Sequence, residues 1–481
     1  MVRLIEVTAS VGRLVPEVVK PERKPHLTER LIWTAVALII YLIMGYIDLF
    51  GISKQTADPL RQMRVLIGGA RGSLAELGIG PIVTGGLILQ LLAGTGFISY
   101  DQSSPEDREL FAASNKAFAL LFSVAMAALY AFGGTYVPSG GTLDLTTRVV
   151  IFAQLLFAGI VILMLDELLQ KGWGIGSGIS LFILAGVARE ITWSLFSPIP
   201  MSDSFADGAV IAFVQATLAS KLTPAMLFVR SPDHSLPTVS GIFVTLALLA
   251  IVVYLENVSI QVPVSSARAR GFSGNYPIKL LFVSTLPIIL VAAVFANLTL
   301  VSYFVQGNKQ IASIGFMNVT LGGIIGEVNA TSGRALNGLV YYTSAPRNIA
   351  ATMADPVRSL IYMLVMVGFC IVFSILWVYT AGMDPRSIAQ QLMDAGAVVP
   401  GFRAANKPLE SIISDYLGVV TVVGGALVGL LASLGDMFGA FGSGTGLLLC
   451  VGIVISLYED IAREQITQLY PRLGRILPGL T

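Results

Sequence analysis

Residues 71–94 read RGSLAELGIGPIVTGGLILQLLAG, and this stretch joins a charged start, a glycine- and proline-rich break and an apolar run. Gly78, Gly80 and Pro81 form the break, and a glycine pair at 85–86 lies inside the run. Glycine permits backbone conformations that other residues avoid, and small residues let helices approach closely in lipid. The stretch therefore predicts a transmembrane helix that begins at a hinge and touches a neighbouring helix along its glycines.

The composition of the whole chain is that of a membrane protein. Of its 481 residues, 55% are hydrophobic and 12% are charged, whereas soluble domains carry roughly 25% charged residues. The net charge of +1 excludes a broad basic surface for nucleic acid. The amino-terminal residues lack the short apolar core and cleavage site of a removable signal peptide, so the first span is expected to remain in the mature protein.

Apolar runs long enough to cross a hydrocarbon core of about 30 Å occur ten times along the chain. An even number of spans places both termini on one side of the membrane. Basic residues are more frequent in the segments on that side, which predicts cytoplasmic termini under the positive-inside rule. The predicted spans are 31–50, 76–97, 111–133, 148–168, 175–196, 238–256, 277–305, 357–381, 411–434 and 438–458.

Two similar motifs suggest that the chain consists of two related halves. GIGSGISLFI (174–183) opens the fifth span and FGSGTGLLL (441–449) opens the tenth, so the two motifs begin on opposite faces. Inverted repeats of five spans produce this pattern, although close helix packing through small residues also explains it. The repeat predicts an all-α fold with two five-helix halves, 31–196 and 238–458, joined by an external linker at 197–237. An amino-terminal segment (1–30) precedes the first half, and a tail (459–481) follows the second.

The positions of ionisable residues constrain what the protein does. The carboxylates that we considered all lie near span ends, so the middle of the membrane is almost entirely neutral; they are Asp48, Asp166, Glu167, Glu256, Asp436 and Glu459. Proton-coupled carriers and intramembrane proteases need central carboxylates. The sequence also has no zinc-protease or phosphate-loop motif and only two histidines. We therefore expect no metal, no cofactor and no enzyme, which leaves a passive conduit or a transporter of a neutral solute.

Two pairs of apolar residues are candidates for the wall of a pathway. Ile79 and Val83 lie beside the break in the second span, and Ile179 and Ile183 follow the Gly-Ser-Gly start of the fifth. Residues four apart share one helix face, although the same spacing fits lipid-facing or core positions. The segment 57–72 before the second span has an apolar side, which fits either an interfacial helix or a re-entrant stopper.

Five stretches together carry a resemblance to a known family. They are the opening stretch, VPEVVKPERK (15–24), LDELLQKGWGIGSGISLFI (165–183), SARARGFSGNYPIKL (266–280) and DMFGAFGSGTG (436–446). In their order and spacing they resemble the SecY family, the central subunit of the Sec protein-conducting channel, and its archaeal and eukaryotic branch in particular. The resemblance implies two inverted halves around an hourglass pore. Such a channel passes unfolded secretory polypeptides across the membrane and releases transmembrane segments sideways into lipid.

The resemblance also implies roles for individual residues. A plug helix at 58–72 would close the outer funnel, with Leu60, Met63, Leu66 and Ile67 on its apolar side. The pore constriction would be a ring of aliphatic side chains, namely Ile79, Val83, Ile179, Ile183, Ile289 and Leu434. Thr84 and Asn297 match polar positions of the lateral gate, whereas the family's third polar gate position is not evident in 120–130. Contacts with the ribosome would involve Arg268, Arg270 and Arg403.

Partners and location follow from the same resemblance. A SecE-like gamma subunit and a small beta subunit would complete a heterotrimer, and signal sequences, nascent polypeptides and membrane lipid would meet at the gate. Because the chain has no nucleotide-binding motif, the driving force would come from a partner such as the translating ribosome, docked through its RNA phosphates. The expected location is the cell membrane, or the endoplasmic reticulum membrane in a eukaryote.

Overall fold

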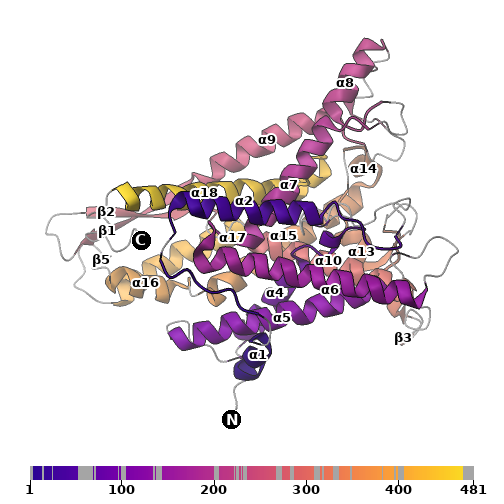
Figure 1. The fold of residues 1–481 in the computed structure, drawn as a ribbon. Coiled ribbons are helices and arrows are strands. Elements are labelled where there is room, and N and C mark those ends of the chain that lie inside the picture. Colours follow the sequence, from indigo (N-terminus) through magenta and orange to yellow (C-terminus); the bar gives the residue numbers. More distant parts are fainter. Residues whose placement is uncertain are drawn as a thin grey trace.

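Ten helices in the described part of the chain are long and apolar enough to cross a membrane, which confirms the predicted number (Figure 1). The structure is a computed structural model. It describes residues 4–13, 16–23, 25–52, 69, 72–95, 97–98, 104–133, 136, 144–199, 205–220, 223, 227–228, 230, 236–266, 273–281, 286–307, 315–316, 319–328, 335–346, 349–381, 383–394, 397–398 and 406–469.

The first half of the chain is built from helices alone within the described residues. Ser104 caps one of them by accepting a hydrogen bond from the backbone N–H of Asp107, and Pro105 occupies the first helical position. The elements are α1 (Leu4–Gly12), α2 (Leu27–Met44), the 3-10 turn η1 (Leu74–Glu76), α4 (Gly80–Gly94), α5 (Pro105–Phe132), α6 (Leu145–Leu168), the π turn η2 (Leu169–Trp173) and α7 (Gly178–Phe196).

The second half adds short strands to its helices. Strand β1 pairs antiparallel with β2 and with β5, and β3 pairs antiparallel with β4. The elements are α8 (Ala209–Leu218), α9 (Val239–Glu256), β1 (Ser259–Ser266), β2 (Ser273–Lys279), α10 (Leu286–Gly307), β3 (Gly315–Phe316), β4 (Val319–Thr320), α12 (Leu321–Ile325), α13 (Gly338–Thr343), α14 (Ile349–Ala354), α15 (Pro356–Thr380), α16 (Pro385–Asp394), β5 (Ala397–Val398), α17 (Asn406–Met437) and α18 (Gly444–Leu469).

Two predicted spans begin too early in the sequence. The seventh span begins at Leu286 and not at residue 277, because 273–279 pairs with β1 as a strand. The tenth begins at Gly444 and not at residue 438, because Gly439 and Gly442 adopt positive φ angles of 76° and 73° in a turn. Both errors arise because apolar residues beside a span lengthen the apolar run without being helical.

The bundle has two distinct ends. The β1–β2 hairpin and α16 project from one end, and α8, α13 and α14 lie at the other (Figure 1). Helix α2 begins and α18 ends near the hairpin, and Arg30 Nη1 donates to Glu464 Oε2 at 2.8 Å between them. The first and last spans therefore have their terminal ends on the same side, as an even number of spans requires.

The amino-terminal segment is held against the hairpin end of the bundle. Lys171 Nζ donates to Glu17 Oε1 at 2.5 Å, and Trp173 Nε1 donates to the carbonyl of Val19 at 2.8 Å. The hydrogen bond from Lys171 holds the pKa of the Glu17 carboxyl below its ordinary value. These contacts fix the segment before α2 to η2, which follows α6.

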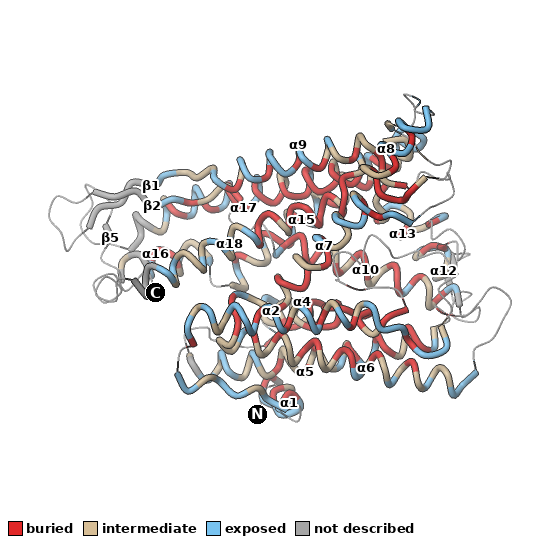
Figure 2. The backbone as a smooth tube through the Cα atoms, turned by 45° about the horizontal axis from the view of Figure 1, so that its top comes forward, coloured by how far each residue is buried: buried red, intermediate tan, exposed pale blue. Residues whose placement is uncertain are grey.

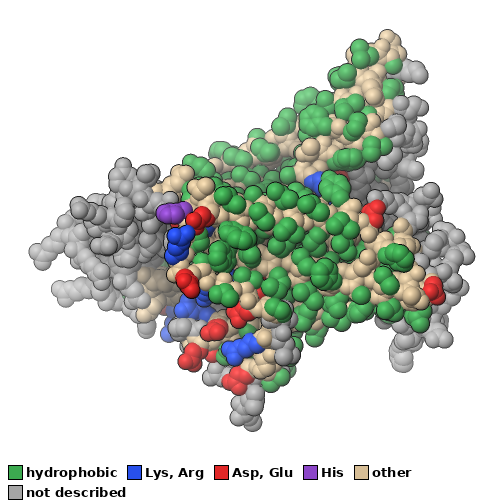
Figure 3. Space-filling model, in the orientation of Figure 1, with side chains coloured by type: hydrophobic (Ala, Val, Ile, Leu, Met, Phe, Trp, Pro, Cys, Tyr) green, Lys and Arg blue, Asp and Glu red, His purple; other side chains and the backbone are tan. Residues whose placement is uncertain are grey.

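The two halves share one apolar core. Buried residues of α4 and α7 from the first half pack in one cluster with residues of α10, α15 and α18 from the second. Figure 2 shows buried positions on the faces that helices turn toward one another. In the face drawn in Figure 3, hydrophobic side chains cover the middle of the helices, and charged side chains lie toward both ends, more of them at one. Apolar surface between polar ends is the arrangement that a bilayer requires.

Candidate functional site: a closed apolar cavity between the halves

An apolar cavity lies where α4, α5, α7, α10 and α18 meet. It brings together four of the six predicted ring residues and both predicted gate residues. Its lining consists of Leu77, Ile79, Gly80, Val83, Thr84, Met126, Tyr130, Ile183, Ile289, Ala292, Ala293, Ala296, Asn297, Leu300 and Leu449. Most of this surface is aliphatic, so the cavity offers few ligands to an ion.

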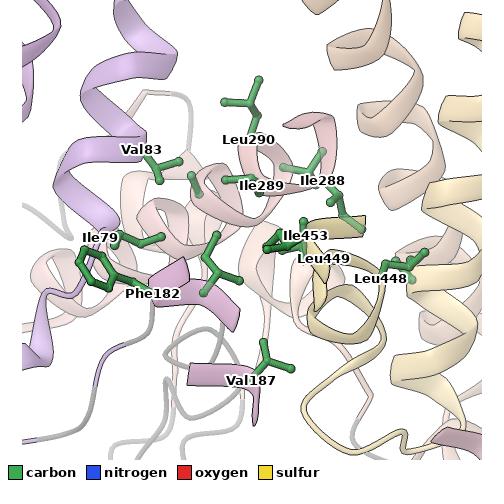
Figure 4. Packing of buried hydrophobic residues seen from close by; sticks show 14 of the residues in the cluster. Ile79, Val83, Phe182, Val187, Ile288, Ile289, Leu290, Leu448, Leu449 and Ile453 are labelled. Atoms are coloured by element: carbon green, nitrogen blue, oxygen red, sulfur yellow. The ribbon is translucent and has the colours of Figure 1, made fainter. Parts of the chain in front are cut away.

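The aliphatic residues close the cavity tightly. Ile79 and Ile183 are 1% and 0% exposed, and Val83, the most exposed of the four ring residues, is 9% exposed. Figure 4 shows Ile79, just before α4, and Val83 on α4 pointing toward Ile289 on α10 and Leu449 on α18. Side chains from both halves therefore meet in one apolar contact, and a polar solute passing through it would lose its water.

The predicted gate residues form a hydrogen bond across the two halves. Asn297 Nδ2 on α10 donates to Thr84 Oγ1 on α4 at 3.0 Å. Thr84 is buried, and both residues line the cavity. This contact lies in a largely apolar wall and links the side chains of α4 and α10 at the cavity.

Helix α5 contributes Met126 and Tyr130 to the same wall. Sequence reasoning did not select either residue, because it searched the stretch 120–130 only for a third polar gate residue. Methionine is flexible and fills irregular spaces. The flexible side chain of Met126 therefore forms part of the cavity wall.

Two of the predicted ring residues do not line the cavity. Ile179 is partly buried and packs against the shared core, and Leu434 is partly buried on α17. Leu449 on α18 lines the cavity instead. Leu449 follows Gly444 by five residues, as Ile183 follows Gly178, so extending the paired Gly-Ser-Gly motif along both spans identifies it.

The predicted plug and ribosome contacts are outside the described residues. This holds for Leu60, Met63, Leu66 and Ile67 and for Arg268, Arg270 and Arg403. Of the predicted plug segment, the structure describes Gly69 and Gly72. Each forms a hydrogen bond with a charged residue outside the segment that the sequence analysis did not select. Arg189 Nη2 on α7 donates to the Gly69 carbonyl at 3.2 Å, and the Gly72 N–H donates to Glu76 Oε2 at 2.8 Å.

Arg189 and Glu76 are two charged residues of the spans that the sequence analysis did not consider. Glu76 is 1% exposed at the start of the second span, and Arg189 lies within α7. Arg189 lies within the apolar run of the fifth span, and a charged residue in such a run is the signal that could have identified it. Both form hydrogen bonds with the described glycines just before the second span, Gly69 and Gly72.

Ten spanning helices and an apolar cavity between two halves define the protein as a helical membrane channel or carrier. The SecY family model matches residues 73–458, and the model of the plug domain of Sec61p matches residues 39–72. The protein translocase subunit SecY of Pyrococcus furiosus is 38% identical over 479 residues, with 98% of each chain covered.

Solved structures give the same result. One described as a protein conducting channel has a TM-score of 0.81 and 32% identity, covering 98% of this chain and 99% of its own. Sec61 in the canine ribosome-channel complex from the endoplasmic reticulum has a TM-score of 0.79 and 31% identity, with the same coverage. The chain belongs to the SecY family. It is a multi-pass membrane protein of a protein translocation channel with a plug domain, and this decides against the solute transporter.

Proposed function

We propose that the cavity is the closed constriction of the protein-conducting pore. The observation that carries this proposal is the meeting of Ile79, Val83, Ile183 and Ile289 in one cavity, with Leu449 completing the contact. Ile179 and Leu434 then flank the ring. A flexible aliphatic ring adapts to the side chains of an extended polypeptide. When no polypeptide is present, the ring holds no water and excludes ions.

The route into lipid is proposed to open between α4 and α5 on one side and α10 and α15 on the other. The hydrogen bond between Thr84 and Asn297 holds this route closed, and an arriving signal sequence or transmembrane segment separates it. The segment 58–72 acts as the plug, in keeping with the plug-domain match over 39–72. Residues Leu60, Met63, Leu66 and Ile67 are the proposed apolar face of that plug.

The partners of the channel are proposed from its relatives and its sequence. Arg268, Arg270 and Arg403 are positioned in the sequence to contact ribosomal RNA, and a relative has been solved in a ribosome-channel complex. A SecE-like gamma subunit and a small beta subunit complete the heterotrimer. Both termini face the cytoplasm, so the β1–β2 hairpin end of the bundle is the ribosome side, in the cell membrane or the endoplasmic reticulum membrane.

The gate hydrogen bond is tested by removing its partners singly and together. Thr84→Val leaves the partly buried Asn297 amide without its acceptor, which costs about 1–2 kcal/mol and disfavours the closed gate. Export of a reporter with a weakened signal sequence should therefore rise roughly 10-fold. The double variant Thr84→Val with Asn297→Leu buries no orphan group and should return export close to the wild-type level.

Thr192→Val is the matched control for this cycle. Thr192 is exposed on α7, and its hydroxyl donates only to the Ala188 carbonyl of its own helix at 2.8 Å. We expect no change in export for this variant. Equal export from the single and double gate variants would contradict the assignment of Thr84 and Asn297 to the gate.

A further inference from the structure

Two buried aspartates occupy equivalent places in the two halves of the protein. Asp166 lies at the end of α6 and is 5% exposed, and Asp436 lies at the end of α17 and is 4% exposed. Each is followed by a Gly-Ser-Gly turn and then by the span that carries a cavity residue. The proposed pore function uses neither carboxyl group.

In the first half, Asp166 contacts the start of α7. The backbone N–H of Ile179 donates to Asp166 Oδ1 at 3.1 Å, and Gln170 Nε2 donates to both carboxyl oxygens at 2.9 and 2.8 Å. Gly178 allows this approach, because a Cβ there would lie 2.7 Å from the Asp166 Cα. The first turn of α7 is thus held directly against the end of α6.

In the second half, Asp436 contacts the start of α18 in the same way. The backbone N–H of Gly444 donates to Asp436 Oδ1 at 2.8 Å, and a Cβ at Gly444 would lie 2.8 Å from the Asp436 backbone nitrogen. The other carboxyl oxygen accepts from the hydroxyl of Tyr362 on α15 at 2.8 Å. Asp436 therefore connects α17, α18 and the proposed gate helix α15.

The first N–H groups of a helix have no partner within that helix. At a buried site in a membrane protein, such a group costs free energy unless another part of the protein accepts its hydrogen bond. Capping by a residue of the preceding span also fixes the rotation and height of the new helix. Ile183 and Leu449, five residues after Gly178 and Gly444, depend on that placement to reach the cavity.

We propose that Asp166 and Asp436 are equivalent positioning residues that seal the pore by fixing the starts of α7 and α18 and thereby directing Ile183 and Leu449 into the constriction. This inference rests on the proposed function of the cavity. It also gives the paired Gly-Ser-Gly motifs a shared role, since each glycine lets a carboxyl group reach the first turn of the next span.

The test compares alanine and asparagine at both positions. Alanine removes the acceptor, whereas asparagine keeps one side-chain oxygen that can accept from the same N–H. Ion conductance per channel, measured without substrate for the purified complex in planar bilayers, should rise roughly 10-fold in D166A and D436A. D166N and D436N should stay near the wild-type value. Thermal midpoints of all variants are recorded on the same samples.

Asp384→Ala is the matched control. Asp384 caps α16 at the hairpin end by accepting from the Ser387 N–H at 3.3 Å, away from the residues that line the cavity. This variant loses a helix cap without a change in conductance. Y362F removes the Tyr362 hydroxyl and keeps the Asp436 carboxyl group and its contact with the Thr445 hydroxyl. This channel should leak severalfold, and it tests the inference if the alanine variants do not accumulate.

Several outcomes would overturn the inference. Alanine variants that accumulate and conduct no more ions than wild type would overturn it. Asparagine variants that leak as much as the alanine variants would also overturn it, and so would a Y362F channel with wild-type conductance. Failure of the proposed function looks different, because polar substitutions at Ile79 and Ile183 would then leave the conductance unchanged. If only the positioning role is wrong, those ring variants leak and the aspartate variants do not.

Discussion

Channels carrying Ile79→Ser together with Ile183→Ser are expected to conduct ions at rest roughly 10- to 100-fold more than wild type. The two isoleucines are 1% and 0% exposed and face the same cavity from α4 and α7. A hydroxyl in place of a methyl-rich side chain favours water in the constriction, and a wetted constriction passes ions. Conductance per channel in planar bilayers measures the effect.

Ile39→Ser and Ile251→Ser are the controls for this prediction. These isoleucines are 55% and 47% exposed on α2 and α9, away from the cavity lining. Serine there should alter insertion or stability and leave resting conductance unchanged. A double ring variant that seals as well as wild type would mean that the cavity is not the barrier to ions.

Gly85→Val is expected to prevent the channel from accumulating in the membrane. A Cβ at this position would lie 2.7 Å from the backbone nitrogen of Ala119 and 2.8 Å from the carbonyl carbon of Phe118. Helices α4 and α5 touch there through their backbones, so a valine forces them apart. We expect a loss of about 3 kcal/mol or more, at the upper end of overpacking costs. Protein yield and the thermal midpoint in detergent report it.

Gly418→Ala provides the comparison, because no atom lies within 4 Å of a Cβ placed there on α17. Alanine at an open helical position should be neutral or should stabilise by up to about 1 kcal/mol. If Gly85→Val and Gly418→Ala accumulate equally and melt at the same temperature, the close contact between α4 and α5 does not limit assembly.

These glycines account for the unusual composition of the opening stretch. Gly78 adopts a positive φ of 50° at the break before α4, a conformation that glycine accepts readily. Gly85 makes the backbone contact with α5. The glycines of this stretch thus allow the backbone break at the start of the second span and the close approach of α4 to α5.

The sequence predicted the number of spans well because an apolar run of about 20 residues is a strong signal. It placed the start of the seventh span wrongly, since Ile278 and Leu281 are as apolar as a span residue. Ile278 instead packs from β2 against residues of α15 and α17 such as Val378 and Ile413. Strand pairing depends on tertiary contacts, which local hydropathy does not contain.

The residues of the cavity were only partly predictable for a related reason. Spacing of four residues puts Ile179 and Ile183 on one face, yet only Ile183 lines the cavity. The rotation of α7 depends on the helices that it packs against, and no periodicity within α7 reports it. Leu449 was predictable from the paired motif, whereas Arg189 was overlooked because a single charge scarcely changes the hydropathy of a span.

The most direct test of the central claim is photocrosslinking from position 183 to a radiolabelled nascent chain stalled on a ribosome, with position 79 as a second probe and position 251 as the lipid-facing control. The proposed pore predicts crosslinks from 183 and 79 that appear only when the chain is long enough to reach the middle of the membrane, and none from 251. Crosslinks from 183 and 79 only to neighbouring spans or lipid, at every chain length, would contradict the assignment of this cavity as the protein-conducting pore.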